Sequence, residues 1–397
     1  MAAAKPGRTF FTRCAFCSLL VLALWVLTNN TDWRKEIAAS TEVVSQYGER
    51  GRTLFQTALT NNGFPVGQPV RAFVFAKTHK TGSTTIREVL ATFIRRNNIT
   101  NFAQRAPFPF IAGYPGRFKC EFLFPRGQVV DVIHGHSRLD IKEMQRCISP
   151  KAKYFSVIRE PWTQFQSTLQ FYGRHFKIGK APSCFGMPVS RVLQGRILSV
   201  TNFMMESHRI LNKSVPWYFR FKNFQAHDLG FDPMLQDEFK IKLKLLELDN
   251  KMDLVMINEY MDESFVLLKE LLNLDWDDFV VVDKHKRSYE KVKLESPEHI
   301  RAFNNLSNID IALYQHFNST FWKKVNQYGR ERMAKDLELL RNSRRKAKAK
   351  KVAKREASFH GFKQRQFVIE ENEKMPLEIS HRLADYMAQN SGSCFLK

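Results

Sequence analysis

The residue types best suited to chemistry in this chain come directly after a short apolar run. The run Phe73-Val-Phe-Ala leads into Lys77-Thr-His-Lys80-Thr-Gly82-Ser-Thr-Thr85. An apolar run of this length predicts a buried strand, and the glycine and hydroxyl residues after it predict a tight turn into a helix. Such a turn brings backbone N–H groups, hydroxyls and a helix N-terminus to one point, where an anionic group can bind. Lys80 adds a positive charge, so the stretch is a candidate phosphate loop.

The order of residues in this loop differs from that in nucleoside triphosphatases. Their loop reads G-x-x-x-x-G-K-[ST], with the lysine directly after the last glycine. Here Lys80 precedes Gly82 by two residues, and the first glycine of the pattern is absent. The sequence therefore does not predict a nucleoside triphosphatase. The alternative that needs no chemistry is a strand–helix turn with a Ser or Thr cap.

A second candidate anion site follows another apolar run. Residues 154–158 predict a strand, and Arg159-Glu-Pro161 comes directly after it. Proline is favoured in the first turn of a helix, so a helix is expected to begin there. Ser167 would lie two turns into that helix, and Arg159 and Ser167 could bind one phosphate together. The alternative is a surface ion pair between Arg159 and Glu160 or another acid.

The elements that must position these residues alternate between strands and helices. Four short apolar runs, rich in β-branched and aromatic residues, predict buried parallel strands at 71–76, 129–133, 154–158 and 253–257. Amphipathic spacing predicts helices at 84–96 and 262–272. This alternation predicts an α/β fold with a parallel sheet.

The N-terminus indicates a secretory-pathway membrane protein. Residues 14–28 contain no charge and follow three basic residues, which favours a signal-anchor helix with a cytoplasmic tail at 1–13. A cleaved signal peptide is the alternative. The polar residues 29–69 would form a lumenal stem. We therefore expect a single-pass type II membrane protein with its folded part in the lumen.

The positive charge of the chain is unevenly distributed. The 397 residues have a formal net charge of +23, and residues 341–365 hold eleven basic side chains against one acidic. Because so much of the excess lies in one tail, the sequence does not predict a nucleic-acid-binding protein. The tail could be a solvated helix, or it could contact anionic glycans or lipid head groups. The sequence shows no cluster with metal-ligand spacing, so no metal is expected.

Four cysteines lie outside the apolar N-terminal segment, namely Cys120, Cys147, Cys184 and Cys394. In an oxidising lumen they allow two disulfides in three pairings, and the sequence does not choose among these. Five N-x-[ST] sequons, beginning at Asn29, Asn98, Asn212, Asn305 and Asn318, fit the same compartment.

Several blocks of this sequence resemble one enzyme family in the same order along the chain. The loop at 77–85 resembles the K-T-H-K-T-x-S-S-T motif of the galactose-3-O-sulfotransferases. The other similar blocks are 165–173, 223–232, 253–269 and 310–322. Lys222 stands where the family often has Arg. The similarity covers about residues 70–330 and implies a P-loop-like sulfotransferase fold with helices on both faces of the sheet. A sulfotransferase domain at 70–335 and a basic extension at 336–397 are expected.

The resemblance implies that the sulfate donor is 3′-phosphoadenosine-5′-phosphosulfate (PAPS) and the acceptor a galactose-terminated glycolipid or glycan. It places Lys80 at the bridging oxygen of the donor. The residues expected to bind the donor are Lys77, Lys80, Thr81, Gly82, Ser83, Thr84, Thr85, Arg159 and Ser167. A Golgi location is expected for such an enzyme, and the oligomeric state stays open.

A general base is needed to take the proton of the sugar hydroxyl, and histidine is the usual choice. His136 follows the strand predicted at 129–133 and is our candidate, with His134 as the competitor. Two weaker donor contacts are His79, inside the loop, and the basic turn 286–288. The rival functions are a glycosaminoglycan 2-O-sulfotransferase, because His134-Gly-His136 resembles that group, and an inactive glycan-binding glycoprotein.

Overall fold

The computed structural model describes residues 68–100, 113–123, 128–173, 200–211, 213, 217–279 and 292–357. All of these belong to one compact unit, which begins at Gly67. The expected cytoplasmic tail, signal anchor, nearly all of the stem and the basic turn 286–288 lie outside the described residues. Within the ranges that are described, no helix combines the length and apolar character needed to cross a membrane.

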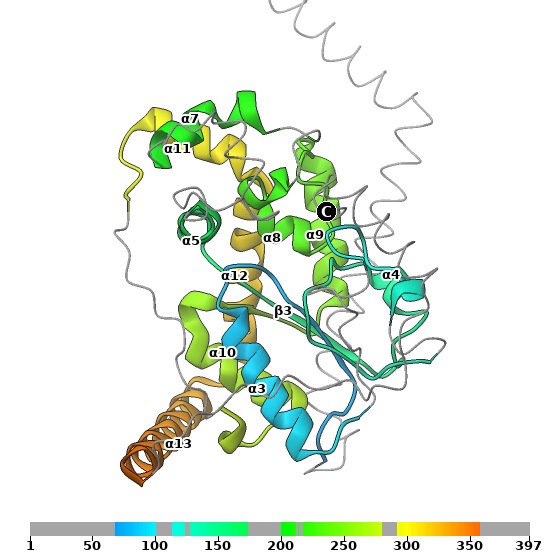
Figure 1. Ribbon diagram of the computed structural model, residues 1–397, viewed down its shortest axis with the longest axis vertical. Coiled ribbons are helices and arrows are strands. Elements are labelled where there is room, and N and C mark those ends of the chain that lie inside the picture. Colours follow the sequence, from blue (N-terminus) through cyan, green and yellow to red (C-terminus); the bar gives the residue numbers. More distant parts are fainter. Residues whose placement is uncertain are drawn as a thin grey trace, which may run out of the picture. The chain divides into compact units, whose positions relative to one another are not determined.

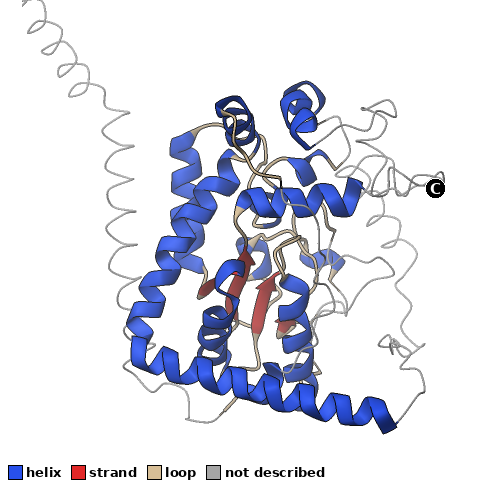
Figure 2. Ribbon diagram, turned by 90° about the vertical axis from the view of Figure 1, so that its left-hand side faces the viewer, coloured by secondary structure: helices blue, strands red, loops and turns tan. Residues whose placement is uncertain are grey.

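The sheet has four parallel strands in the order β2-β1-β3-β4. The strands are β1 Phe73–Ala76, β2 Val132–Ile133, β3 Lys153–Ile158 and β4 Leu254–Ile257. All four lie within or overlap the predicted runs, so the predicted parallel α/β sheet is confirmed. Figure 2 shows the strands in the centre of the molecule with helices on either side.

Ten α-helices are described, and all of them are labelled in Figure 1. They are α3 Ser83–Arg96, α4 Ile141–Met144, α5 Pro161–Gly173, α7 Val200–Ile210, α8 Phe224–Asp228, α9 Glu238–Lys251, α10 Met261–Leu272, α11 Pro297–Leu306, α12 Asn308–Tyr328 and α13 Arg330–Ala357. The predicted helices at 84–96 and 262–272 are confirmed as α3 and α10. The basic run after residue 340 is the C-terminal part of α13, a continuous helix that begins before the expected boundary at 335.

The strand order places two loops at one position of the sheet. The chain runs from β1 outward to β2 and then returns to β3 on the other side of β1. In open parallel sheets, ligands bind at the carboxyl ends of the strands where the order reverses in this way. The loop after β1 and the turn after β3 both leave the sheet there, because Phe75 and Phe155 are register partners.

Apolar burial explains why β1 and α3 form. Every residue of β1 is buried, and α3 buries Ile86, Val89, Leu90 and Phe93 completely against the sheet. These four side chains recur at the spacing of one helical face. Fixing the strand and the helix on the same core fixes the loop between them.

A disulfide joins Cys120 to Cys147. It connects the 3₁₀ turn Cys120–Phe122 with the segment that follows α4. One of the pairings left open by the sequence is thereby selected, while Cys184 and Cys394 lie outside the described residues.

Candidate active site

The loop after β1 has a backbone shape that few sequences allow. Lys80 has φ of 63° and Gly82 has φ of 77°, both in the left-handed region. Gly82 is the N-cap of α3, and a Cβ on it would lie 2.4 Å from Nδ2 of Asn258. The positive φ favours glycine here, and a larger residue would also have to displace the Asn258 amide that bonds to the carbonyl of Thr81.

All five carbonyl oxygens of residues 78–82 accept hydrogen bonds from protein groups. In the order of the acceptors, the donors are Ser83 Oγ at 2.5 Å, Gln164 Nε2 at 3.1 Å, Arg159 Nη1 at 3.4 Å, Asn258 Nδ2 at 2.9 Å and Thr85 N at 3.0 Å. The first N–H groups of an α-helix have no partner within the helix, so those of Ser83 and Thr84 are candidates to bind an anion. The N–H of Thr85 is already used inside the loop. Ser83, Thr84 and Thr85 all lie in this turn, as the phosphate-loop prediction requires.

Lys77 contributes a buried cation beside the loop. Its Nζ donates to Ser83 Oγ at 2.9 Å, and only 4% of the residue is exposed. Burial, with the nearby positive charge of Arg87, lowers the pKa of Lys77 to about 7. An anion bound at the loop would favour the charged form of this amine.

The turn after β3 lies against the phosphate loop. Arg159 Nη1 donates to the carbonyl of Lys80 at 3.4 Å, and its Nε donates to Thr163 Oγ1 at 3.1 Å. Two candidate phosphate sites more than seventy residues apart in the sequence are thus adjacent in space.

One face of α5 is directed toward the loop after β1 and the turn after β3. Thr163 holds Arg159, and the ring of Phe171 lies 4.0 Å from Nζ of Lys80. Ser167 lies midway between them, and a spacing of four residues puts all three side chains on one helical face. The structure therefore places Ser167 on the same side of α5 as the two loops.

The predicted base stacks on a histidine of the phosphate loop. The rings of His136 and His79 lie 3.8 Å apart with planes 15° from parallel, and Phe224 stacks on His79 at 4.7 Å. Burial, with the charge of Lys77 nearby, holds the pKa of His79 well below its usual range. Burial likewise lowers the pKa of His136 well below its usual range and that of His134 to about 4. The lowered pKa values keep all three imidazoles neutral, the state from which a proton can be accepted, and also make them weaker bases than a solvent-exposed histidine.

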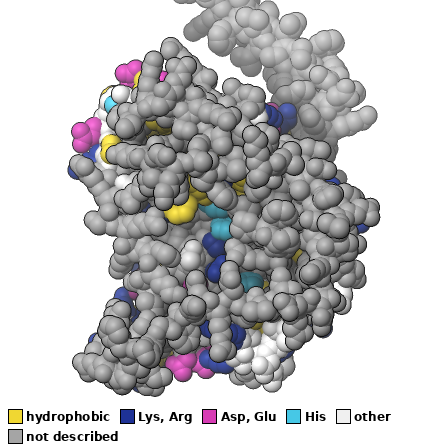
Figure 3. All heavy atoms as spheres, viewed as in Figure 1, with side chains coloured by type: hydrophobic (Ala, Val, Ile, Leu, Met, Phe, Trp, Pro, Cys, Tyr) yellow, Lys and Arg dark blue, Asp and Glu magenta, His cyan; other side chains and the backbone are white. Residues whose placement is uncertain are grey.

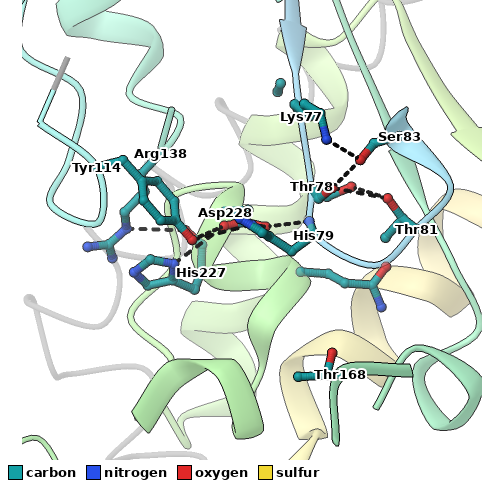
Figure 4. Close-up of polar contacts among 12 residues, drawn as sticks. Lys77, Thr78, His79, Thr81, Ser83, Tyr114, Arg138, Thr168, His227 and Asp228 are labelled. Atoms are coloured by element: carbon teal, nitrogen blue, oxygen red, sulfur yellow. Dashed lines mark hydrogen bonds and ion pairs between the residues drawn. The ribbon is translucent and has the colours of Figure 1, made fainter. Parts of the chain in front are cut away.

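Asp228 fixes the orientation of His79. Its Oδ2 accepts from the backbone N–H of His79 at 2.7 Å and lies 2.8 Å from Nδ1 of the same residue. Its Oδ1 accepts from the hydroxyl of Tyr114 at 2.9 Å, and Figure 4 shows this row of side chains. With Nδ1–H directed at a carboxylate, Nε2 of His79 is the nitrogen left to accept a proton.

Sequence reasoning assigned no role to several residues that the structure brings to the site. Asp228 stood in a block that resembles the family but had no assigned chemistry. Tyr114 and Gln164 had no sequence signal, because neither lies in a recognisable pattern. His79, which the sequence offers only as a weaker donor contact, is buried and stacks between His136 and Phe224. On the face shown in Figure 3, basic and histidine side chains lie next to one another near the middle of the molecule.

The arrangement combines a candidate phosphate loop, a second turn that contains Arg159, and neutral histidines at the carboxyl ends of three neighbouring strands, β2, β1 and β3. Such a site can hold a ligand with two anionic groups, stabilise negative charge on a leaving group and accept a proton. Among the described residues no group of His, Cys, Asp and Glu has the geometry of a metal site.

Comparison with known proteins gives one family over most of the chain. The model of the family described as galactose-3-O-sulfotransferase matches residues 13–364. This match is wider on both sides than the similarity over residues 70–330 that the motifs alone indicated.

The individual relatives have similar sequence identities to this chain. Galactosylceramide sulfotransferase of Mus musculus is 30% identical over 284 residues, which cover 70% of this chain and 63% of the relative. Galactose-3-O-sulfotransferase 2 of Homo sapiens is 31% identical, with 70% and 67% covered, and galactose-3-O-sulfotransferase 3 of Mus musculus is 29% identical, with 69% and 62% covered. The match thus spans a little under two thirds of the length of the first and third of these relatives.

Proposed function

The chain belongs to the galactose-3-O-sulfotransferase family, and on this premise we propose that it transfers a sulfuryl group from PAPS to the 3-hydroxyl of galactose. The acceptor would be a galactose-terminated glycolipid or glycoprotein glycan. The relatives include proteins named galactosylceramide sulfotransferase and proteins named galactose-3-O-sulfotransferase, which supports both acceptor classes.

One observation carries the proposal at the level of chemistry. The guanidinium of Arg159 donates to the carbonyl of Lys80, so the two candidate anion-binding turns lie side by side. PAPS has a 5′-phosphosulfate and a separate 3′-phosphate, and it needs two anion sites at a fixed separation. We assign the 5′ side to Lys77 and residues 80–85, and the 3′-phosphate to Arg159 and Ser167.

The proposed reaction is an in-line displacement at sulfur. The galactose hydroxyl oxygen forms a bond to sulfur while the bond from sulfur to the bridging oxygen breaks. The leaving group is adenosine 3′,5′-bisphosphate, and the hydroxyl proton passes to a base. Lys80 would stabilise the negative charge that develops on the bridging oxygen. Cations stabilise the leaving group in the same way in phosphoryl transfer.

His136 remains our candidate for the base, and His134 its competitor. The stacking of His136 on His79 supports the assignment, because it places the ring beside the phosphate loop. If His136 takes the proton, His136→Ala should lower turnover far more than it lowers donor affinity, whereas His134→Ala should not. The reverse result would assign the base to His134.

Substitution of the two cations tests the proposed function. Lys80→Ala should lower sulfate transfer by about 10²–10³-fold, because charge on the leaving group loses its partner. Arg159→Ala should weaken binding of adenosine 3′,5′-bisphosphate by about 10–100-fold, as expected for a lost charge-assisted contact. Transfer of labelled sulfate and calorimetry measure the two effects.

A matched control is Arg332→Ala on α13, which removes an arginine paired with Glu270 at 2.7 Å. It should leave both measurements unchanged. Unaltered turnover in Lys80→Ala would remove this lysine from the mechanism. In the wild type, labelling of heparan or chondroitin in place of galactosylceramide and lactosamine glycans would favour a glycosaminoglycan 2-O-sulfotransferase. Failure to label any acceptor would favour an inactive glycan-binding protein.

We also propose a Golgi location as a single-pass type II membrane protein with a lumenal catalytic domain. The apolar residues 14–28 after three basic residues support this placement, and the disulfide between Cys120 and Cys147 fits an oxidising lumen.

A further inference from the structure

The short helix α8 lies between the two loops that we assign to the donor. All five of its residues, Phe224–Asp228, are buried. It belongs to the block 223–232, which resembles the family but has no part in the reaction proposed above. A buried five-residue helix has little intrinsic stability, so its position must come from tertiary contacts.

The N-terminal end of α8 is held by α12. The carboxylate of Asp310 accepts from the backbone N–H of Ala226 at 2.7 Å and of Gln225 at 3.3 Å. In return, Oδ1 of Asn223 accepts from the first N–H groups of α12, those of Ile309 at 2.9 Å and Asp310 at 3.2 Å. Each helix therefore caps the other, which satisfies backbone donors that would otherwise be buried without partners.

The C-terminal end of α8 is held by three cations. They donate to the carbonyl oxygens of residues 227, 230 and 231, which lie at or just beyond the end of the helix. The contacts are Arg138 Nε to His227 at 3.1 Å, Arg138 Nη2 to Phe231 at 2.8 Å, Arg117 Nη2 to Gly230 at 3.2 Å and Lys244 Nζ to Gly230 at 3.0 Å. The cations at the C-terminus match the helix dipole.

From this fixed position α8 reaches both donor loops. The side chain of Gln225 accepts from the backbone N–H of Arg159 at 2.7 Å and donates to the carbonyl of Arg159 at 2.9 Å. Arg159 follows the end of β3, and the glutamine amide satisfies its backbone groups much as a neighbouring strand would. At the other end of the helix, Asp228 holds the backbone and the ring of His79.

We propose that α8 sets the separation of the two donor-phosphate loops, with Gln225 as a positioning residue that acts through Arg159. This inference rests on the proposed function, because it takes Arg159 as a ligand of the 3′-phosphate. The side-chain amide of Gln225 bonds to the backbone of Arg159, so we expect it to act on donor binding through Arg159. Its loss should therefore weaken donor binding only while the Arg159 side chain is present.

A double-mutant cycle with Gln225→Met and Arg159→Ala tests the proposal. Methionine has a similar size but cannot make either hydrogen bond. In the wild-type background Gln225→Met should weaken binding of adenosine 3′,5′-bisphosphate by about tenfold, as expected for two lost hydrogen bonds to a ligand-positioning group. In the Arg159→Ala background it should change the affinity by less than about twofold, because coupled residues do not act additively.

The matched control is Gln166→Met on α5. Gln166 is also buried and accepts from a backbone N–H, but from that of Val292, at 2.8 Å, in place of that of Arg159. It should show a comparable loss of melting temperature with unchanged nucleotide affinity. If Gln225→Met does not fold, Gln225→Asn replaces it in the cycle. Asparagine keeps the amide group, but its side chain is too short to reach both backbone groups of Arg159.

The possible outcomes distinguish a failure of the role proposed for α8 from a failure of the proposed sulfotransferase function. No nucleotide binding by the wild type would overturn the proposed function. Binding that is weakened by Arg159→Ala but unaffected by Gln225→Met would overturn the role of α8 alone. Equal losses from Gln225→Met in both backgrounds would show a general effect on folding and would also overturn it.

Discussion

At the scale of single residues, the ionisation of Lys77 is the property most open to measurement. Its pKa is lowered to about 7 by burial, then by Arg87, while Asp228 acts in the opposite direction. A substantial fraction of the free protein therefore has a neutral Lys77 at pH 8. A phosphate bound at the loop would stabilise the charged amine and raise its pKa.

We therefore expect binding of adenosine 3′,5′-bisphosphate at pH 8 to be accompanied by proton uptake. Calorimetry in two buffers of different ionisation enthalpy measures this uptake. The nucleotide is already fully ionised at pH 8, because the second pKa of a phosphate monoester is about 6. Lys77→Met should bind without the uptake, and equal uptake by both proteins would contradict the assignment to Lys77.

At the scale of elements, the mutual caps of α8 and α12 depend on one buried carboxyl. Burial raises the pKa of Asp310 to about 7, although backbone N–H groups of α8 act in the opposite direction, and the nearby Asp228 adds to the increase. The folded state thus holds this proton more tightly than the unfolded chain does, for which the pKa is about 3.8. The resulting contribution to stability is fully present below about pH 4 and is lost as the pH rises through 7.

We expect the free energy of unfolding of the wild type, relative to that of Asp310→Asn, to fall between pH 4 and pH 7. Urea unfolding at several pH values within this window measures the difference. Asp249→Asn is a suitable control, because Asp249 on α9 is a partly exposed carboxylate that lies 3.0 Å from His316 of α12. A pH-independent difference for Asp310→Asn would show that its carboxyl does not titrate as the structure indicates.

At the scale of the whole molecule, the disulfide between Cys120 and Cys147 restricts the unfolded chain. The two residues are 27 apart in the sequence, and closing a loop of that length is worth about 3–4 kcal/mol in the chain-entropy model. Cys120→Ser and Cys147→Ser should each lower the free energy of unfolding by about this amount, measured by denaturant unfolding of oxidised protein. Since either change removes the whole bond, the double variant should lose little more than one single variant. Additive losses would argue against the pairing.

The sequence by itself determined the elements and the places where chemistry can occur. Apolar runs identify the four strands, and the glycine, hydroxyl and lysine residues after Ala76 identify the phosphate loop, because both signals are local. Arg159 at the end of β3 was found in the same way. The N-terminal anchor, the stem, the location, the donor, the acceptor and the roles of the site residues stay predictions, since they lie outside the described residues or concern molecules other than this chain.

The tertiary structure alone decided which distant residues meet at these loops. Asp228 contacts His79 across 149 positions of sequence, and Gln225 contacts Arg159 across 66. No local pattern encodes such pairs, because they depend on how α8 packs between the strand ends and α12. The pKa of Lys77 and the neutral state of the histidines could not be predicted from the sequence either. Both follow from burial, and burial is a property of the folded chain.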